Sequence, residues 1–267
     1  MKTKNRTDNF FYLQPDFIVV LCMILAFIPI ILYFQVRFMT STILFFVVPS
    51  IYLFIRKSKN PKRIFSTVLI GTIASFILDF LAEFNGAWAW APYGQLIFKN
   101  KILGYVTPDV MIWFIFWIFL TVVFYEHFFE HEKSDKISYR FKYSVASIIG
   151  ILALLIFLYL YYPSFLYFRY AYLLIGIFFG AAPLIAVLWR NPKLIIKFMK
   201  ASVFLVFLFL SFEITALKLN QWRFPGEYIG QISLLGVSFP FEEFFFWILM
   251  STAISLSYYE LFVDDER

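Results

Sequence analysis

The sequence predicts an all-α integral membrane protein of about eight transmembrane helices, and its composition and the spacing of its charges support this. Of the 267 residues, 62% are hydrophobic and only 15% are charged. The charged residues lie in short clusters between apolar runs, whose lengths match the roughly 17 to 25 residues that cross a bilayer as a helix. These runs are apolar on every side, whereas strands of a transmembrane barrel alternate apolar and polar residues. A helical bundle is therefore expected.

The predicted spans follow the apolar runs in order along the chain. Eight are expected: 17–36, 38–55, 64–84, 109–129, 143–162, 165–189, 198–218 and 241–263. The third, seventh and eighth reach spanning length only if acidic residues are accepted within the helices or at their ends. The basic N-terminal segment lacks a small-residue cleavage site, so the first apolar run is expected to be retained as a span.

The basic residues predict the orientation of these spans. Lys and Arg gather before the first span, in the "RKSKNPKR" segment, and in the connections that follow the fourth and sixth spans. Such an excess marks the cytoplasmic side, so a multi-pass protein of the cell membrane with both termini in the cytoplasm is expected. The net charge of +6 agrees with affinity for anionic lipid and is no argument for nucleic acid binding. The single cysteine, Cys22, excludes an intramolecular disulfide.

Two segments of the chain carry an acid and a tryptophan at the same spacing. In "LDFLAEFNGAWAW", Asp79 is followed nine positions later by Trp88. In "FEITALKLNQWRF", Glu213 is followed nine positions later by Trp222. Both segments lie near the expected outer end of a span, so the sequence indicates an internal repeat.

The features that follow these segments also match in order. Residues 103–108 and 235–240 share the pattern Leu-Gly-x-x-x-Pro, and the next spans end in "FYEHF" and "YYELF". Each half would contain four spans, and an even number means that the two halves run in the same direction. The chain is therefore predicted to consist of two parallel membrane repeats, residues 1–134 and 135–267.

Five acids are expected at a similar depth near the outer leaflet: Asp79, Glu83, Glu213, Glu242 and Glu243. Capping of the helix that follows Pro240 accounts for one acid of the Glu242-Glu243 pair. Neighbouring residues point about 100° apart around a helix, so the second acid must face protein or lipid. Asp79 and Glu213 lie late in their spans, where an acid marks either a functional site or a buried ion pair.

A basic partner for these acids is expected on the same side of the membrane. Arg169, at the start of the sixth span, is the first candidate, and Lys218 and Arg223 lie nearer to the surface.

The acids and the rings around them suggest a chemistry. A carboxyl group that is desolvated and lies beside another can hold a proton at neutral pH, which suits it to act as a general acid. Aromatic ring faces stabilise a cation that such an acid creates. The residues expected to contact a substrate are those near the acids: Glu83, Trp88, Trp222, Phe241 and Phe244.

Motifs for cofactors and metals are not found in the sequence. A Gly-x-Gly-x-x-Gly fingerprint for flavin or nicotinamide does not occur, nor does an Asp-rich magnesium motif. His127 and His131 lie four residues apart, at the end of the fourth span, where a solvated helix end is expected rather than a metal site. The sequence therefore predicts neither a cofactor nor a metal.

Together, these motifs resemble the non-flavin membrane lycopene cyclases, in the form that fuses two repeats. In that family each half carries an acid late in a helix, a Gly-x-Trp segment, a Leu-Gly turn and a Pro-x-Glu-Glu or Pro-x-Glu-Asp motif. The most specific match here is Pro240-Phe241-Glu242-Glu243, within "LLGVSFPFEEFFFWILM". In the first half, Thr107-Pro108-Asp109-Val110-Met111 has a displaced acid and lacks the pair.

The resemblance implies carotenoid biosynthesis by an intramolecular lyase of the isomerase class. An acid would protonate the terminal double bond of a linear carotenoid such as lycopene, the cation would close a ring, and a base would remove a proton. Glu242 or Glu243 would be the acid, and Asp79 and Glu213 would be the base or stabilise the cation.

Other functions remain open at this point. The missing acid pair in the first half is compatible with a cyclase that acts on one end of its substrate, or with a hydratase that adds water to the same kind of cation. A transporter that uses the intramembrane acids is another possible function. A non-catalytic scaffold is also compatible with the missing first-half acids. A homo-oligomer and partners from the same pathway are left open too.

Overall fold

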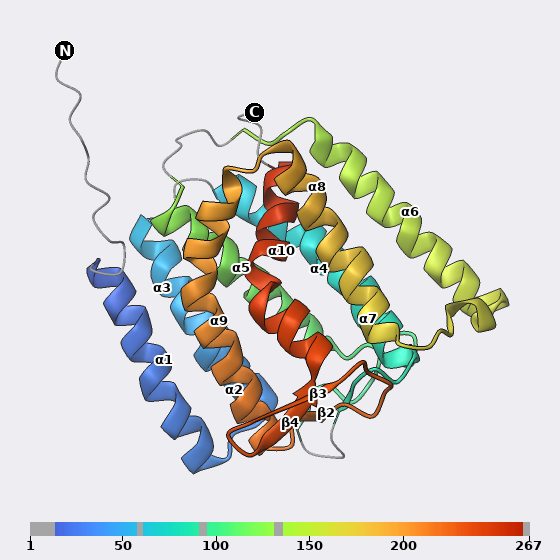
Figure 1. The fold of residues 1–267 in the computed structure, drawn as a ribbon, viewed down its shortest axis with the longest axis horizontal. Helices are drawn as coiled ribbons and strands as arrows, with labels where there is room; N and C mark the ends of the chain where they lie inside the picture. The colour runs from blue at the N-terminus through green and yellow to red at the C-terminus, as the bar shows by residue number, and fades with distance from the viewer. Residues whose placement is uncertain (1–13, 58–60, 91–94, 131–135, 264–267) are drawn as a thin grey trace.

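The computed structural model describes residues 14–57, 61–90, 95–130 and 136–263, and these form a multi-pass bundle of helices (Figure 1). Within the described residues, seven helices are long and apolar enough to cross a membrane, and one bent pair of helices provides an eighth span. The prediction of an all-α membrane protein is therefore confirmed.

The helices follow one another in alternating directions (Figure 1). The first four spans are formed, in order, by α1 (Pro15–Phe34), by α2 (Phe38–Thr42) with η2 (Ile43–Val47) and α3 (Val48–Lys57), by α4 (Pro61–Phe84), and by α5 (Pro108–Phe128). The last four are formed by α6 (Arg140–Tyr161), by α7 (Ala171–Ile175) with η4 (Gly176–Ala181) and α8 (Ala182–Arg190), by α9 (Leu194–Lys218), and by η5 (Glu243–Leu249) with α10 (Ser251–Tyr258) and η6 (Tyr259–Val263).

Helix α5 lies at the centre of the bundle, and 67% of its 18-residue apolar stretch is buried inside the protein. The outermost helices are α1 and α6. Only 22% of the corresponding apolar stretch of α1 and 17% of that of α6 is buried. Because these two helices are apolar yet largely uncovered, their outward faces suit lipid chains rather than water.

Four short strands lie together at one end of the bundle, which we call the hairpin end (Figure 1). Strand β1 (Ala89–Trp90) pairs with β2 (Trp222–Arg223), and β3 (Gln231–Leu234) pairs with β4 (Val237–Pro240). The β3–β4 turn holds Leu235 and Gly236 at positive φ, as a two-residue hairpin requires. Leu103 and Gly104 adopt the same pair of positive φ angles, so the two Leu-Gly segments form the same kind of turn.

Two predicted spans differ from straight helices. The eighth is π-helical from Glu243 to Leu249 and bends by 56° before Ser251, as kinks do at π-helical turns. The sixth was expected from residue 165, but α7 begins at Ala171. Its delay follows from a 3₁₀ turn, η3 (Pro163–Leu166), and from the left-handed conformation of Tyr170.

Small residues allow the π-helical turns η4 and η5 to pack closely. A Cβ atom added to Gly176 would lie 2.3 Å from the ring of Phe246, and one added to Gly180 would lie 2.8 Å from Ile254. Both distances are too short for any side chain, so the two glycines set how closely the spans that contain η4 and η5 approach each other.

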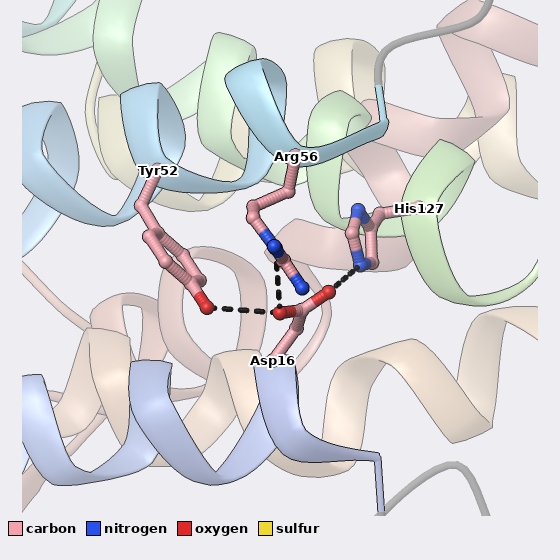
Figure 2. Close-up of polar contacts among 4 residues, drawn as sticks. All are labelled: Asp16, Tyr52, Arg56 and His127. Atoms are coloured by element: carbon pink, nitrogen blue, oxygen red, sulfur yellow. Dashed lines mark hydrogen bonds and ion pairs between the residues drawn. The ribbon is translucent and has the colours of Figure 1, made fainter.

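A polar cluster joins three spans at the end of the bundle opposite the hairpins (Figure 2). Asp16 of α1 accepts hydrogen bonds from Tyr52 (2.8 Å, Oη to Oδ1) and from Arg56 (3.1 Å, Nε to Oδ1), both on α3. Asp16 Oδ2 lies 3.0 Å from Nε2 of His127, on α5. The expected solvated helix end was wrong for His127, because its side chain is only 1% exposed. His131 lies outside the described residues.

The same end carries a reciprocal pair of buried hydrogen bonds between α5 and the last span. The Tyr125 hydroxyl donates to Glu260 Oε1 at 2.7 Å, and the Tyr259 hydroxyl donates to Glu126 Oε1. The two Tyr-Glu pairs that close the predicted repeats thus exchange partners.

Candidate functional site

Two neighbouring cavities lie inside the bundle and share the walls Leu78, Phe114, Trp117 and Trp247. One, which we call the acid cavity, has a volume of about 40 Å³. The other, the central cavity, has a volume of about 80 Å³. The two cavities are therefore neighbours, separated by these shared side chains, and together they contain the strongest candidate site.

The acid cavity is lined by two of the predicted catalytic residues, Glu213 and Glu243, among aromatic rings. Five tryptophans belong to its walls: Trp88, Trp113, Trp117, Trp222 and Trp247. None of the described residues that line it is basic. Two carboxyl groups thus face a largely aromatic space whose described walls contain no cation.

Glu243 lies in the first turn of η5, and its side chain is held by one donor. The hydroxyl of Tyr172, from α7, donates a hydrogen bond to Glu243 Oε2. Tyr172 also lines the acid cavity, where its ring lies 6.1 Å from that of Trp247. The helix that carries Tyr172 therefore fixes one oxygen of Glu243 and leaves Oε1 for other contacts.

Glu213 lies in the second-last turn of α9, which ends at Lys218, and is also held by one donor. The indole Nε1 of Trp222 donates to Glu213 Oε1 at 2.9 Å. Strand β2 carries Trp222 back along the end of α9, which explains the spacing of acid and tryptophan seen in the sequence. A matched bond occurs in the first half with other partners, since Trp90 Nε1 donates to Glu83 Oε1 at 2.9 Å.

Glu242, although adjacent to Glu243, lies outside both cavities. Its Oε1 accepts the backbone N–H of Ile229 at 2.8 Å, and the residue is fully buried. Asp109 behaves alike in the first half, because its two oxygens accept the backbone N–H groups of Ile97 (2.8 Å) and Phe98 (2.9 Å). Both acids thus hold the loop that precedes their helix.

The first-half acids of the predicted site do not reach the cavities. Asp79 is fully buried in α4, and among the described residues neither of its oxygens has a hydrogen-bond partner. Glu83 forms an ion pair with Lys101, at 2.6 Å between Nζ and Oε2. Neither acid lines the acid cavity or the central cavity.

Of the residues expected to contact a substrate, Trp88 and Trp222 line the acid cavity, and Phe241 and Phe244 do not. Phe241 is 39% exposed, and its ring stacks on that of Phe245 with 5.7 Å between centroids. Phe244 packs against Phe239. These two phenylalanines are therefore close to the acids in the sequence, but they do not line the cavity.

The expected basic partner of the acids was wrong. Arg169 pairs with Glu227 at 3.0 Å, and both side chains are more than half exposed. Among the described residues, the cation that pairs with one of the five acids is Lys101, which pairs with Glu83 and lies in the loop before α5. Since Arg169 lies in the connection that precedes α7, the late start of this helix keeps it at the surface.

Sequence reasoning missed several walls of the acid cavity. Tyr172 lies between the two repeated segments, where no motif points to it. Trp113 and Trp117 carry a weak signal, because residues four apart share one face of a helix. Their rings lie 4.5 Å apart. In a chain with 7 Trp and 38 Phe, that spacing does not separate a cavity wall from a lipid contact.

A metal centre finds no support among the described residues, where no group of three or more His, Cys, Asp or Glu side chains is arranged to hold an ion. The arrangement instead suits proton transfer to an apolar ligand. A comparison of the chain with family models, with curated proteins and with solved structures found no match.

Proposed function

We propose that this protein is a carotenoid end-group cyclase that isomerises a linear carotenoid such as lycopene by acid catalysis in the acid cavity. One observation carries the proposal: Glu213 and Glu243 line one aromatic cavity whose described walls contain no basic residue. Such a space suits a hydrocarbon, and the two carboxyl groups can give and take one proton. The resemblance of Pro240-Phe241-Glu242-Glu243 to the lycopene cyclase motif supports the substrate class.

The reaction assigns one role to each carboxyl group. Glu243, as the neutral acid, gives its proton to the terminal C=C bond of the polyene, and the cation that results is attacked by a neighbouring C=C bond to close a six-membered ring. Glu213, as the carboxylate, removes a proton from carbon and restores a double bond. One proton enters and one leaves, so the product is an isomer and no redox cofactor is consumed.

The surroundings of the two acids support this division of roles. The indole of Trp222 donates to Glu213, and a donated hydrogen bond stabilises a carboxylate. Tyr172 bonds one oxygen of Glu243 and leaves the other to carry the proton. Trp113, Trp117 and Trp247 line the cavity, and a ring face turned toward the cation would contribute roughly 0.5 to 2 kcal/mol.

We further propose that the chain lies in the cell membrane with both termini in the cytoplasm, as two parallel repeats. Basic residues favour this orientation, which places the hairpin end outside. The antiparallel pairing of Ala89 with Arg223, and the exchange between the two Tyr-Glu pairs, are what a two-fold relation between the halves would produce.

Expression in cells that accumulate lycopene, followed by chromatography and mass spectrometry of the pigments, tests this function. A cyclase converts lycopene into products of unchanged mass, and one or two rings distinguish action on one end from action on both. A hydratase would add the mass of water. Unchanged lycopene in cells with correctly inserted protein would refute activity on lycopene.

A proton-conducting transporter is the second candidate, and the central cavity favours it. Hydroxyl groups of Thr67, Ser75, Ser251 and Ser255 belong to its walls, next to the acid cavity. Proteoliposomes with a pH-sensitive dye inside test this function, because proton flux that is lost in Glu243→Gln would support transport. No flux above that of empty liposomes would reject it.

A further inference from the structure

An apolar groove on the side of the bundle, which we call the side groove, adjoins the central cavity. It has a volume of about 280 Å³ and is formed by Leu81, Phe168, Leu174, Ile175, Phe178 and Phe179. All six side chains are hydrocarbon, and they come from α4, from the loop before α7, from α7 and from η4. Phe178 is 67% exposed, so the groove opens on the surface of the sixth span.

The interior cavities are too small for the proposed substrate. An apolar cavity of about 150 Å³ is the size that holds one benzene molecule. The central cavity has about 80 Å³ and the acid cavity about 40 Å³. A ring-sized end group therefore reaches Glu243 only if a wall moves, and the remainder of a long hydrocarbon must lie outside the cavities.

Among the described residues, Phe179 is the one that both the side groove and the central cavity have in their lining. Its backbone is held, because the Tyr258 hydroxyl donates to the Phe179 carbonyl oxygen at 2.9 Å, and the adjacent Gly180 packs against Ile254. Phe179 is only partly buried, so its side chain has room to rotate while its backbone stays held.

We infer that the side groove is the route by which a linear isoprenoid hydrocarbon passes from the lipid into the central cavity, with Phe179 as the gate. This inference rests on the proposed function for the identity of the ligand. The reacting end would pass Phe179 toward Glu243, and the rest of the chain would occupy the groove and the lipid beside it. The groove has no polar group for a water-soluble ligand, which favours this occupant.

A plug in the groove tests the route by kinetics. Leu174→Trp fills the groove, and Ile185→Trp adds the same ring to a lipid-facing position of α8 that is 62% exposed. In proteoliposomes that contain lycopene, Leu174→Trp is expected to lower the initial rate about tenfold, as blocked access does, and Ile185→Trp to leave it unchanged. Equal rates for a folded Leu174→Trp variant and the parent would overturn the route.

Photo-cross-linking tests the same route without catalysis. p-Benzoylphenylalanine is placed at Phe178 or at Ile185 and irradiated in liposomes that contain lycopene, and the adducts are quantified by mass spectrometry. The route predicts about tenfold more adduct at 178 than at 185, because a bound chain stays at the label longer than one that diffuses in lipid. Equal adducts at the two positions would overturn it.

The two proposals fail in different ways. Adduct at Phe178 without any cyclisation would support the route and reject the cyclase. Cyclisation with equal adducts, or with an unaffected Leu174→Trp variant, would reject the route and leave the cyclase in place.

Discussion

The two helices that follow a Leu-Gly turn and a proline use their acids differently. Ile97 and Ile229 each lie eleven residues before the proline, Pro108 or Pro240. The backbone N–H of Ile97 is accepted by Asp109, and that of Ile229 by Glu242, so each helix uses one acid to hold its loop. Only the second helix has a further acid in its first turn, Glu243, and this residue lines the acid cavity.

The comparison indicates that the Glu242-Glu243 pair combines two separate roles: one acid holds the loop, and the other lines the cavity. In the first half, the loop is held, and the residue that follows the holding acid is Val110, an apolar residue that lines the acid cavity. In the second half, the loop is held and a carboxyl group faces the cavity as well. The first half therefore has the acid that holds the loop, Asp109, and has no acid among the described residues that line the cavity.

The largest expected effect is at the acid that has no first-half counterpart. Glu243→Gln keeps the size of the side chain and removes its proton, so conversion of lycopene should fall by about 100-fold or more, the contribution of a general acid. Pigment analysis at equal protein levels measures this. Glu227→Gln, on the exposed pair with Arg169, is the control and should retain full activity. Full activity in Glu243→Gln would refute the acid role.

The next largest effect is on stability and concerns the two acids that hold the loop in each half, Asp109 and Glu242. Asp109→Ala removes the acceptor of two backbone N–H groups, at Ile97 and Phe98, and should lower the free energy of unfolding by about 2 kcal/mol. Glu242→Ala removes one such acceptor and should cost about half as much. Thermal unfolding in detergent measures both. A larger loss in Glu242→Ala would contradict this order.

A smaller effect on activity is expected at Tyr172. Tyr172→Phe removes the hydroxyl that holds Glu243 and should slow conversion about tenfold, the value of one hydrogen bond of about 1.4 kcal/mol. Phe224, another wall of the acid cavity, lies 6.2 Å from Tyr172 between ring centroids and has no hydroxyl, so Phe224→Leu changes the packing of the cavity wall without removing a hydrogen bond. If both variants lose the same activity, packing rather than the hydrogen bond accounts for the role of Tyr172.

The smallest expected effect lies at the opposite end of the bundle. Tyr125→Phe breaks one of the two reciprocal bonds and should lower the free energy of unfolding by about 1 kcal/mol, with no change in activity per folded molecule. Tyr259→Phe should behave alike if the two halves are equivalent there. A loss of activity without loss of stability would place this end of the bundle in the chemistry.

The fold class and the approximate places of the spans could be predicted from the sequence, because a bilayer demands long apolar helices and the chain has them. The bend of the eighth span could not, since no proline or glycine lies between Glu243 and Ser251. Its π-helical turn is associated with close packing of Phe246 on Gly176, a contact between distant segments. The late start of α7 was missed although Pro163 precedes it, because an apolar run does not reveal where a helix begins within it.

For the candidate site, the amino-acid sequence alone shows which residues are chemically unusual: acids in apolar surroundings, repeated with tryptophan, glycine and proline. The tertiary structure alone decided that Glu213 and Glu243 line a cavity, that Glu242 and Asp109 hold loops, and that Asp79 lies elsewhere. The reason is that an acidic residue within an apolar run looks the same in the sequence whichever direction its side chain takes. Its role depends on the direction of the side chain and on the partners that distant helices bring to it.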